Sequence, residues 1–186
     1  MIYGIWTFCA ALIAFIISTV TGKFLIPYLR KLHFGQTILE EGPKWHKGKQ
    51  GTPTMGGIMF IVAIVIVTIA STVVYAVTGN EFVTSFYADI PKECVLIFCG
   101  LGLAVANGVI GFIDDYIKVV KKRNLGLTAL QKLILQFIAA AAFLAVLAIA
   151  GFGTTTTIPF AGKVDLGFFY YIIAAVAIVG IVNSVN

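Results

Sequence analysis

Residues 94–115, CVLIFCGLGLAVANGVIGFIDD, join an uncharged apolar run to two adjacent acidic residues. The run from Cys94 to Ile113 is twenty residues long, which is enough for a helix to cross the hydrocarbon core of a bilayer. Asp114 and Asp115 follow directly at its end. Because carboxylates are costly at the end of a membrane helix, this pair marks a candidate functional site.

A short basic run follows the acidic pair, made of Lys118, Lys121, Lys122 and Arg123. Asp114 and Lys118 stand four residues apart, so on a helix they share a face. An interfacial ion pair with Asp115 in solvent is one interpretation. It leaves one acid unpaired near a low dielectric, which favours the alternative of metal binding or proton removal. Acids and cations together at one membrane surface are what a site for Mg²⁺ and phosphates needs.

The composition is that of a membrane protein. Of the 186 residues, 60% are hydrophobic and 11% are charged, whereas soluble domains have roughly 45–50% and about 25%. The formal charge of +5 does not indicate nucleic acid, because the basic residues cluster beside apolar runs, where such clusters face anionic lipid or set topology. The three cysteines fit no metal-binding spacing and are interpreted as packing residues.

Five apolar segments are each long enough to span a bilayer as a helix. The sequence therefore predicts an all-α integral membrane protein with five transmembrane helices in one membrane domain. The predicted spans are residues 2–29, 55–77, 94–113, 133–152 and 166–185. No basic region precedes the first span, which favours a retained helix over a signal peptide. The Thr-rich connection at 151–166 predicts a short β-hairpin on the periplasmic side.

The basic residues also predict the orientation. Residues 21–51 and 114–132 carry eleven of the thirteen Lys and Arg residues. By the positive-inside rule, the connections at about 30–54 and 114–132 are cytoplasmic and the N-terminus lies outside.

A second candidate segment is PKWHKGKQGTPTMGG at residues 43–57. Its glycines, lysines and threonines suit an anionic phosphate or diphosphate, although the order is not that of a Walker A loop. The alternative is a basic loop that caps the second span, with Gly56 and Gly57 easing helix packing. Lys132 either snorkels or joins the site, and Asn183 and Asn186 share a helix face at the same membrane surface.

Taken together, segments 43–57, GFIDDYIKV at 111–119, GLTALQK at 126–132 and NSVN at 183–186 resemble the phospho-N-acetylmuramoyl-pentapeptide transferases. These are one branch of the polyprenyl-phosphate sugar-1-phosphate transferases. The resemblance implies a ten-helix, Mg²⁺-dependent enzyme of the bacterial inner membrane with a cytoplasmic active site. Such an enzyme moves phospho-MurNAc-pentapeptide from UDP-MurNAc-pentapeptide to undecaprenyl phosphate, giving lipid I and UMP.

The resemblance also assigns roles. Asp114 and Asp115 match the catalytic acidic pair and would contribute to a Mg²⁺ site whose main ligand lies beyond Asn186. The chain would be the N-terminal half of the enzyme and inactive alone. Membrane lipid is an expected partner, nucleic acid is not, and a homodimer stays open. Lys49, Thr54, Asn183 and Asn186 match residues at the nucleotide-sugar site. Three cations near the acidic pair are also expected to bind substrate phosphates: Lys118, Lys122 and Lys132.

Three rival functions are weighed against this prediction. A related transferase that uses another UDP-sugar is the nearest. A transporter predicts acids near mid-membrane, whereas Asp114 and Asp115 follow a span. A scaffold that binds anionic lipid explains the lysines but leaves the acidic pair unused.

Overall fold

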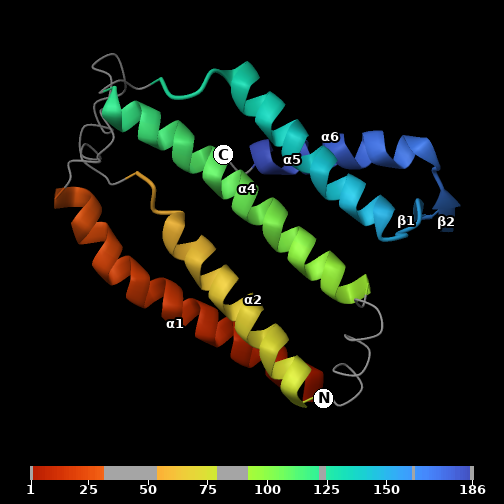
Figure 1. Ribbon diagram of the computed structural model, residues 1–186, viewed down its shortest axis with the longest axis horizontal. Helices are drawn as coiled ribbons and strands as arrows, with labels where there is room; N and C mark the ends of the chain where they lie inside the picture. The colour runs from red at the N-terminus through yellow and green to blue at the C-terminus, as the bar shows by residue number, and fades with distance from the viewer. Residues whose placement is uncertain (1, 32–53, 79–91, 122–124, 161, 185–186) are drawn as a thin grey trace. The chain divides into compact units, whose positions relative to one another are not determined.

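The computed structural model describes residues 2–31, 54–78, 92–121, 125–160 and 162–184 (Figure 1). Five helices and one two-stranded hairpin make up this part of the chain, which confirms the predicted helical class and the hairpin. The elements are α1 (Ile2–Lys31), α2 (Ile58–Thr78), α4 (Lys92–Val120), α5 (Ala129–Ile149), β1 (Thr155–Ile158), β2 (Gly162–Asp165) and α6 (Phe168–Ser184).

Three of these helices are long and apolar enough to cross a membrane, over Thr7–Lys31, Cys94–Val120 and Ala129–Ile149. α2 and α6 contribute shorter apolar stretches, Ile58–Val74 and Phe168–Ser184. Large apolar side chains are exposed on the helices; Phe24 is 72% exposed and Phe168 is 74% exposed. Apolar surface on this scale needs a lipid or protein neighbour. The chain is therefore a membrane protein, and the count of five spans stays a prediction.

The ends of α4 and α5 differ from the ends of the predicted spans, because polar groups and not only apolar residues belong to these helices. α4 does not end at Ile113 but continues to Val120, so Asp114 and Asp115 lie within its last two turns. Helix α5 begins at Ala129, four residues before the predicted span, and ends at Ile149. Its end is a glycine cap. Gly151 has a φ of 75°, its N–H donates to Ala148, and the N–H of Phe152 donates to Leu147, as in a Schellman motif.

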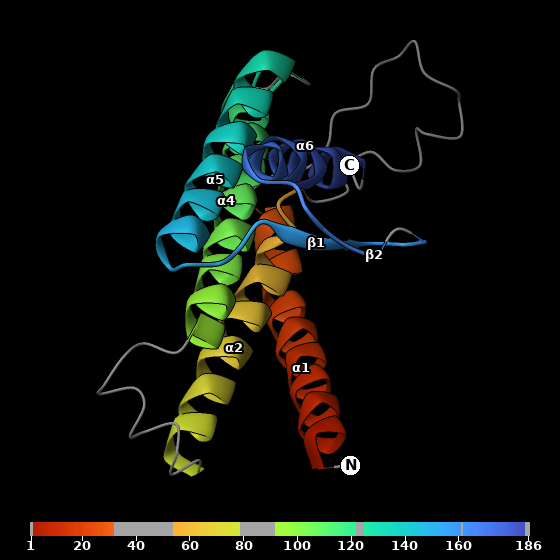
Figure 2. The same cartoon turned by 90° about the vertical axis from the view of Figure 1, so that its right-hand side faces the viewer.

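The described residues form two compact units, and the boundary falls inside α4 at Gly111. The first unit contains α1, α2, the C-terminal part of α4 and the segment 125–128. Helices α1 and α2 lie side by side in it (Figures 1 and 2). A Cβ on Gly22 of α1 would lie 2.8 Å from the sulfur of Met59 on α2, so the missing side chain allows the two helices to pack closely.

The second unit contains the rest of α4, helices α5 and α6, and the hairpin. Helices α5 and α6 pack against each other. The strands pair antiparallel, with Thr155 opposite Asp165 and Ile158 opposite Gly162. The Asp165 carboxylate accepts hydrogen bonds from the Thr154 hydroxyl and the Gly167 N–H, which closes the base of the hairpin.

Candidate functional site

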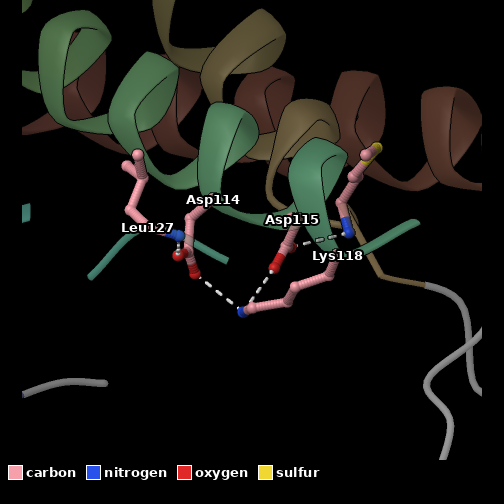
Figure 3. Close-up of polar contacts among 5 residues, drawn as sticks. Asp114, Asp115, Lys118 and Leu127 are labelled. Carbon is pink, nitrogen blue, oxygen red and sulfur yellow. Dashed lines mark hydrogen bonds and ion pairs between the residues drawn. The ribbon is translucent and has the colours of Figure 1, made fainter. Parts of the chain in front are cut away.

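The acidic pair of α4 shares one cation. The Lys118 ammonium lies 2.7 Å from Asp114 Oδ2 and 3.1 Å from Asp115 Oδ1. Figure 3 shows the Lys118 side chain reaching the two carboxylates from the following turn. The side chain of Asp114 is 11% exposed and that of Asp115 is 29% exposed. The ion pair between Asp114 and Lys118, one of the two interpretations of the sequence, is present, but Lys118 also bonds Asp115, which is therefore not merely solvated.

Two other segments of the first unit donate backbone hydrogen bonds to the same pair. The N–H of Leu127 lies 2.8 Å from Asp114 Oδ1 (Figure 3). The N–H of Met55, sixty positions before Asp115 in the chain, lies 3.2 Å from Asp115 Oδ2. Each of the four carboxylate oxygens thus accepts a hydrogen bond. The pair thereby joins the end of the 43–57 segment to the start of the 126–132 segment.

The local backbone explains how these amides reach the carboxylates. Met55 has a φ of 68°, a conformation that costs a residue other than glycine free energy and often marks a functional site. Its buried side chain and the turn bond from the Ile58 N–H to its carbonyl at 3.2 Å hold it there. Gly126 has no Cβ, and one built there would overlap the carboxylate and the carbonyl oxygen of Asp114. Glycine at this position therefore permits the close approach of Leu127.

The charges leave room for a further cation, because two carboxylates face one ammonium. Carboxylate oxygens have spare lone pairs and are hard donors that suit Mg²⁺. The described residues contain no group of three or more His, Cys, Asp or Glu side chains that could hold a metal ion together, so they form no complete protein cage for a metal. Mg²⁺ commonly uses one or two carboxylates with water and substrate phosphates, and Asp114 and Asp115 fit that mode.

The other residues predicted to bind substrate lie in several parts of the chain. Thr54 precedes Met55 directly and is half-buried. Lys132 lies in the first turn of α5, in the second unit. Asn183, also in the second unit, donates to Gln136 Oε1 of α5 at 2.7 Å and to the Val179 carbonyl at 2.8 Å. Lys49, Lys122 and Asn186 lie outside the described residues.

Sequence reasoning missed three contributors to this geometry. Met55 and Leu127 act through backbone amides, which no side-chain pattern reveals. Gly126 belongs to the GLTALQK segment, whereas the sequence pattern pointed to close packing at Gly56 and Gly57. A Cβ built on either of these two glycines meets no described atom within 4 Å beyond its chain neighbours. The only sequence signal for Gly126 is its place at the start of the GLTALQK segment, which carries polar residues.

Known proteins match the same segments. Residues 95–186 match the family described as glycosyl transferase family 4, and residues 49–61 match signature 1 of the phospho-N-acetylmuramoyl-pentapeptide-transferases. The chain is 46% identical over 176 residues to the protein of that name from Bacillus subtilis, covering 94% of this chain and 50% of the relative. The identity to the same-named protein of Geobacillus kaustophilus is 45% over 178 residues, covering 95% and 50%. The chain thus spans about half the length of the curated relatives it matches.

Proposed function

The chain belongs to the phospho-N-acetylmuramoyl-pentapeptide-transferase family, and we propose that it forms part of an enzyme that makes lipid I. The substrates are UDP-MurNAc-pentapeptide and undecaprenyl phosphate, and the second product is UMP. The observation that carries the proposal is the hydrogen bond from the Met55 amide to Asp115. It joins the segment that bears the family signature to the acidic pair.

In this reaction a phosphate oxygen of the lipid attacks the sugar-side phosphorus of the nucleotide sugar. A new P–O bond forms, the P–O bond to UMP breaks, and UMP leaves with the electron pair. Because an anion attacks an anion, the site must neutralise charge and align the two phosphates. Asp114 and Asp115 accept a proton from the lipid phosphate or hold the metal, and their backbone donors and Lys118 fix both carboxylates in place.

The proposed cofactor is Mg²⁺, held by Asp114 and Asp115 together with substrate phosphates. When bound, it would supply charge neutralisation on the diphosphate. The proposed substrate contacts are cationic, hydroxyl and amide side chains that suit phosphates and a nucleotide. They are Lys49, Thr54, Lys118, Lys122, Lys132, Asn183 and Asn186.

The proposed location is the bacterial inner membrane, with the N-terminus outside and the acidic pair on the cytoplasmic side. Its support is the Lys and Arg asymmetry. A transporter remains the weaker alternative, because Asp114 is the twenty-third of the 29 residues of α4 and lies away from the middle of that helix. The nearest alternative is transfer from another UDP-sugar.

The test is UMP release by the full-length protein, meaning a chain as long as the relatives above, in detergent with undecaprenyl phosphate. We expect release with UDP-MurNAc-pentapeptide, loss of release with a chelator of divalent metals, and none from residues 1–186 alone. Release with UDP-N-acetylglucosamine but not with UDP-MurNAc-pentapeptide would move the assignment to the alternative. Sustained release by residues 1–186 would contradict the proposal that further residues complete the site.

A further inference from the structure

An open groove of about 770 Å³ runs between α1 and α2 in the first unit, a size typical of ligand sites. Its walls are mainly apolar, and Phe15 and Phe60 are 69% and 54% exposed. The Asp114–Asp115 pair contributes nothing to its lining. Such a groove in a membrane helix pair suits an acyl chain, but apolar walls alone do not identify an occupant.

The polar groups of the groove gather in one stretch of α1. Lys23, Ser18 and Thr19 line it, and no carboxylate of the described residues pairs with Lys23. Pro27 also lines the groove, and the eight remaining lining residues are apolar or small. Because proline has no N–H, the carbonyl of Lys23 loses the donor that the helix would supply. One cation and one backbone acceptor therefore lie together at an apolar groove.

The depth of Lys23 makes it unusual. It lies eight residues before Lys31, where α1 ends with Arg30 and Lys31 in its last turn. Eight residues of helix correspond to about 12 Å, so Lys23 lies well inside the apolar helix relative to the basic end. An intramembrane lysine is costly unless it pairs or reaches the interface. An anionic headgroup provides the pairing.

We propose that the α1–α2 groove binds one acidic phospholipid, with an acyl chain between the helices and the headgroup phosphate at Lys23. One ammonium matches the single charge of a phosphodiester, whereas a phosphate monoester carries about −1.5 to −2 at neutral pH. A headgroup hydroxyl, as in phosphatidylglycerol, can donate to the Lys23 carbonyl. The charge match favours a structural phospholipid over a polyprenyl phosphate. The inference does not depend on the proposed transfer reaction.

The test is native mass spectrometry of the full-length protein in detergent, titrated separately with phosphatidylglycerol and phosphatidylcholine. We expect preferential retention of phosphatidylglycerol by the wild type. Lys23→Gln should weaken it roughly five-fold, as one basic residue contributes about 1 kcal/mol to anionic lipid binding, while phosphatidylcholine retention stays the same. Lys163→Gln in the exposed hairpin strand β2 removes one equal charge and should leave both unchanged.

A second variant and a photoreactive lipid complete the test. Ala14→Phe places a large side chain in the groove without touching Lys23, and it should weaken retention of both lipids. Phosphatidylglycerol with a diazirine in its acyl chain should crosslink to peptides containing Phe15 or Phe60. Equal phosphatidylglycerol retention by wild type and Lys23→Gln, or crosslinks only outside α1 and α2, would overturn the proposal. Displacement of the crosslink by stoichiometric undecaprenyl phosphate would also overturn it, by making the groove a substrate site.

Discussion

Gly126→Ala removes no functional group, yet we expect it to damage the acidic site. A Cβ at position 126 would lie 2.9 Å from Asp114 Cγ and would overlap the neighbouring carboxylate and carbonyl oxygens. The contact is with backbone and a short side chain, so the 125–128 segment must move away from α4. The hydrogen bond of 2.8 Å from the Leu127 N–H to Asp114 Oδ1 would then be lost or lengthened.

The size of the effect follows from that one bond. A hydrogen bond to a charged group is worth about 1.5–3 kcal/mol. Replacing glycine by alanine also lowers the conformational entropy of the unfolded chain, which adds about 0.4–1 kcal/mol to the stability of the folded protein. If the loss falls on the positioning of Asp114, UMP release by the full-length protein should fall about ten- to a hundred-fold. The protein should still insert and fold, since the loop contributes little buried surface.

The assay is kcat for UMP release, with thermal unfolding measured on the same samples. Gly100→Ala is the matched control, because no described atom lies within 4 Å of its built Cβ and alanine suits a helix interior. It should keep the wild-type rate. A Gly126→Ala rate within two-fold of wild type, at unchanged stability, would refute the reasoning that the Leu127 amide positions Asp114.

Three further predictions test other parts of the account. Cysteines replacing Lys47 and Lys122 should resist an impermeant thiol reagent in intact cells while one replacing Thr156 reacts, and external labelling at position 47 would overturn the orientation. A double-mutant cycle of Gln136→Leu and Asn183→Leu should give a coupling of about 0.6 kcal/mol in unfolding, because Asn183 Nδ2 donates to Gln136; zero coupling would contradict a stabilising bond. The hydrogen bond from the Thr154 hydroxyl, and to a smaller extent that from the Gly167 N–H, lowers the pKa of the Asp165 carboxyl. The ionised carboxylate therefore stabilises the hairpin fully above about pH 4, and this stabilisation is lost as the pH falls through the lowered pKa. The amide shift of Gly167 should titrate below the value for free aspartate, and Thr154→Val should raise the midpoint; an unmoved midpoint would count against the hydroxyl.

The sequence predicts the helices well because a membrane forces their form. A long apolar run with no water around it must satisfy its backbone internally, so runs such as Cys94–Ile113 are helical. The hairpin is predictable from β-branched Thr residues followed by Pro159 and Gly162. The end of α4 is not predictable in this way, because the apolar run stops at Ile113 while the helix continues for almost two more turns to Val120. The Asp114–Lys118 ion pair supports this continuation.

The chemistry-bearing side chains are predictable in the same local way, since Asp114, Asp115 and Lys118 lie within five residues. Their hydrogen-bond partners come from Met55 and Leu127, at separations of 60 and 13 positions, and depend on tertiary packing. Glycines show the same limit: sequence alone does not separate Gly126, which meets Asp114, from Gly57, which meets no described atom. Asn183 suited a substrate contact by its position, but its bond to Gln136 needs α5 beside α6.

The most direct test of the central claim is UMP release by Asp114→Asn and Asp115→Asn in the full-length protein. Asparagine keeps the size of the side chain but removes its charge and basicity. If the pair carries the chemistry, each variant should insert and fold but lose at least about 100-fold in rate, because general acid–base catalysis alone is worth roughly 10²–10⁴. An ion pair with only a structural role would cost about 0–1 kcal/mol of stability and no turnover. Near-normal turnover in both variants would contradict the assignment of the chemistry to Asp114 and Asp115.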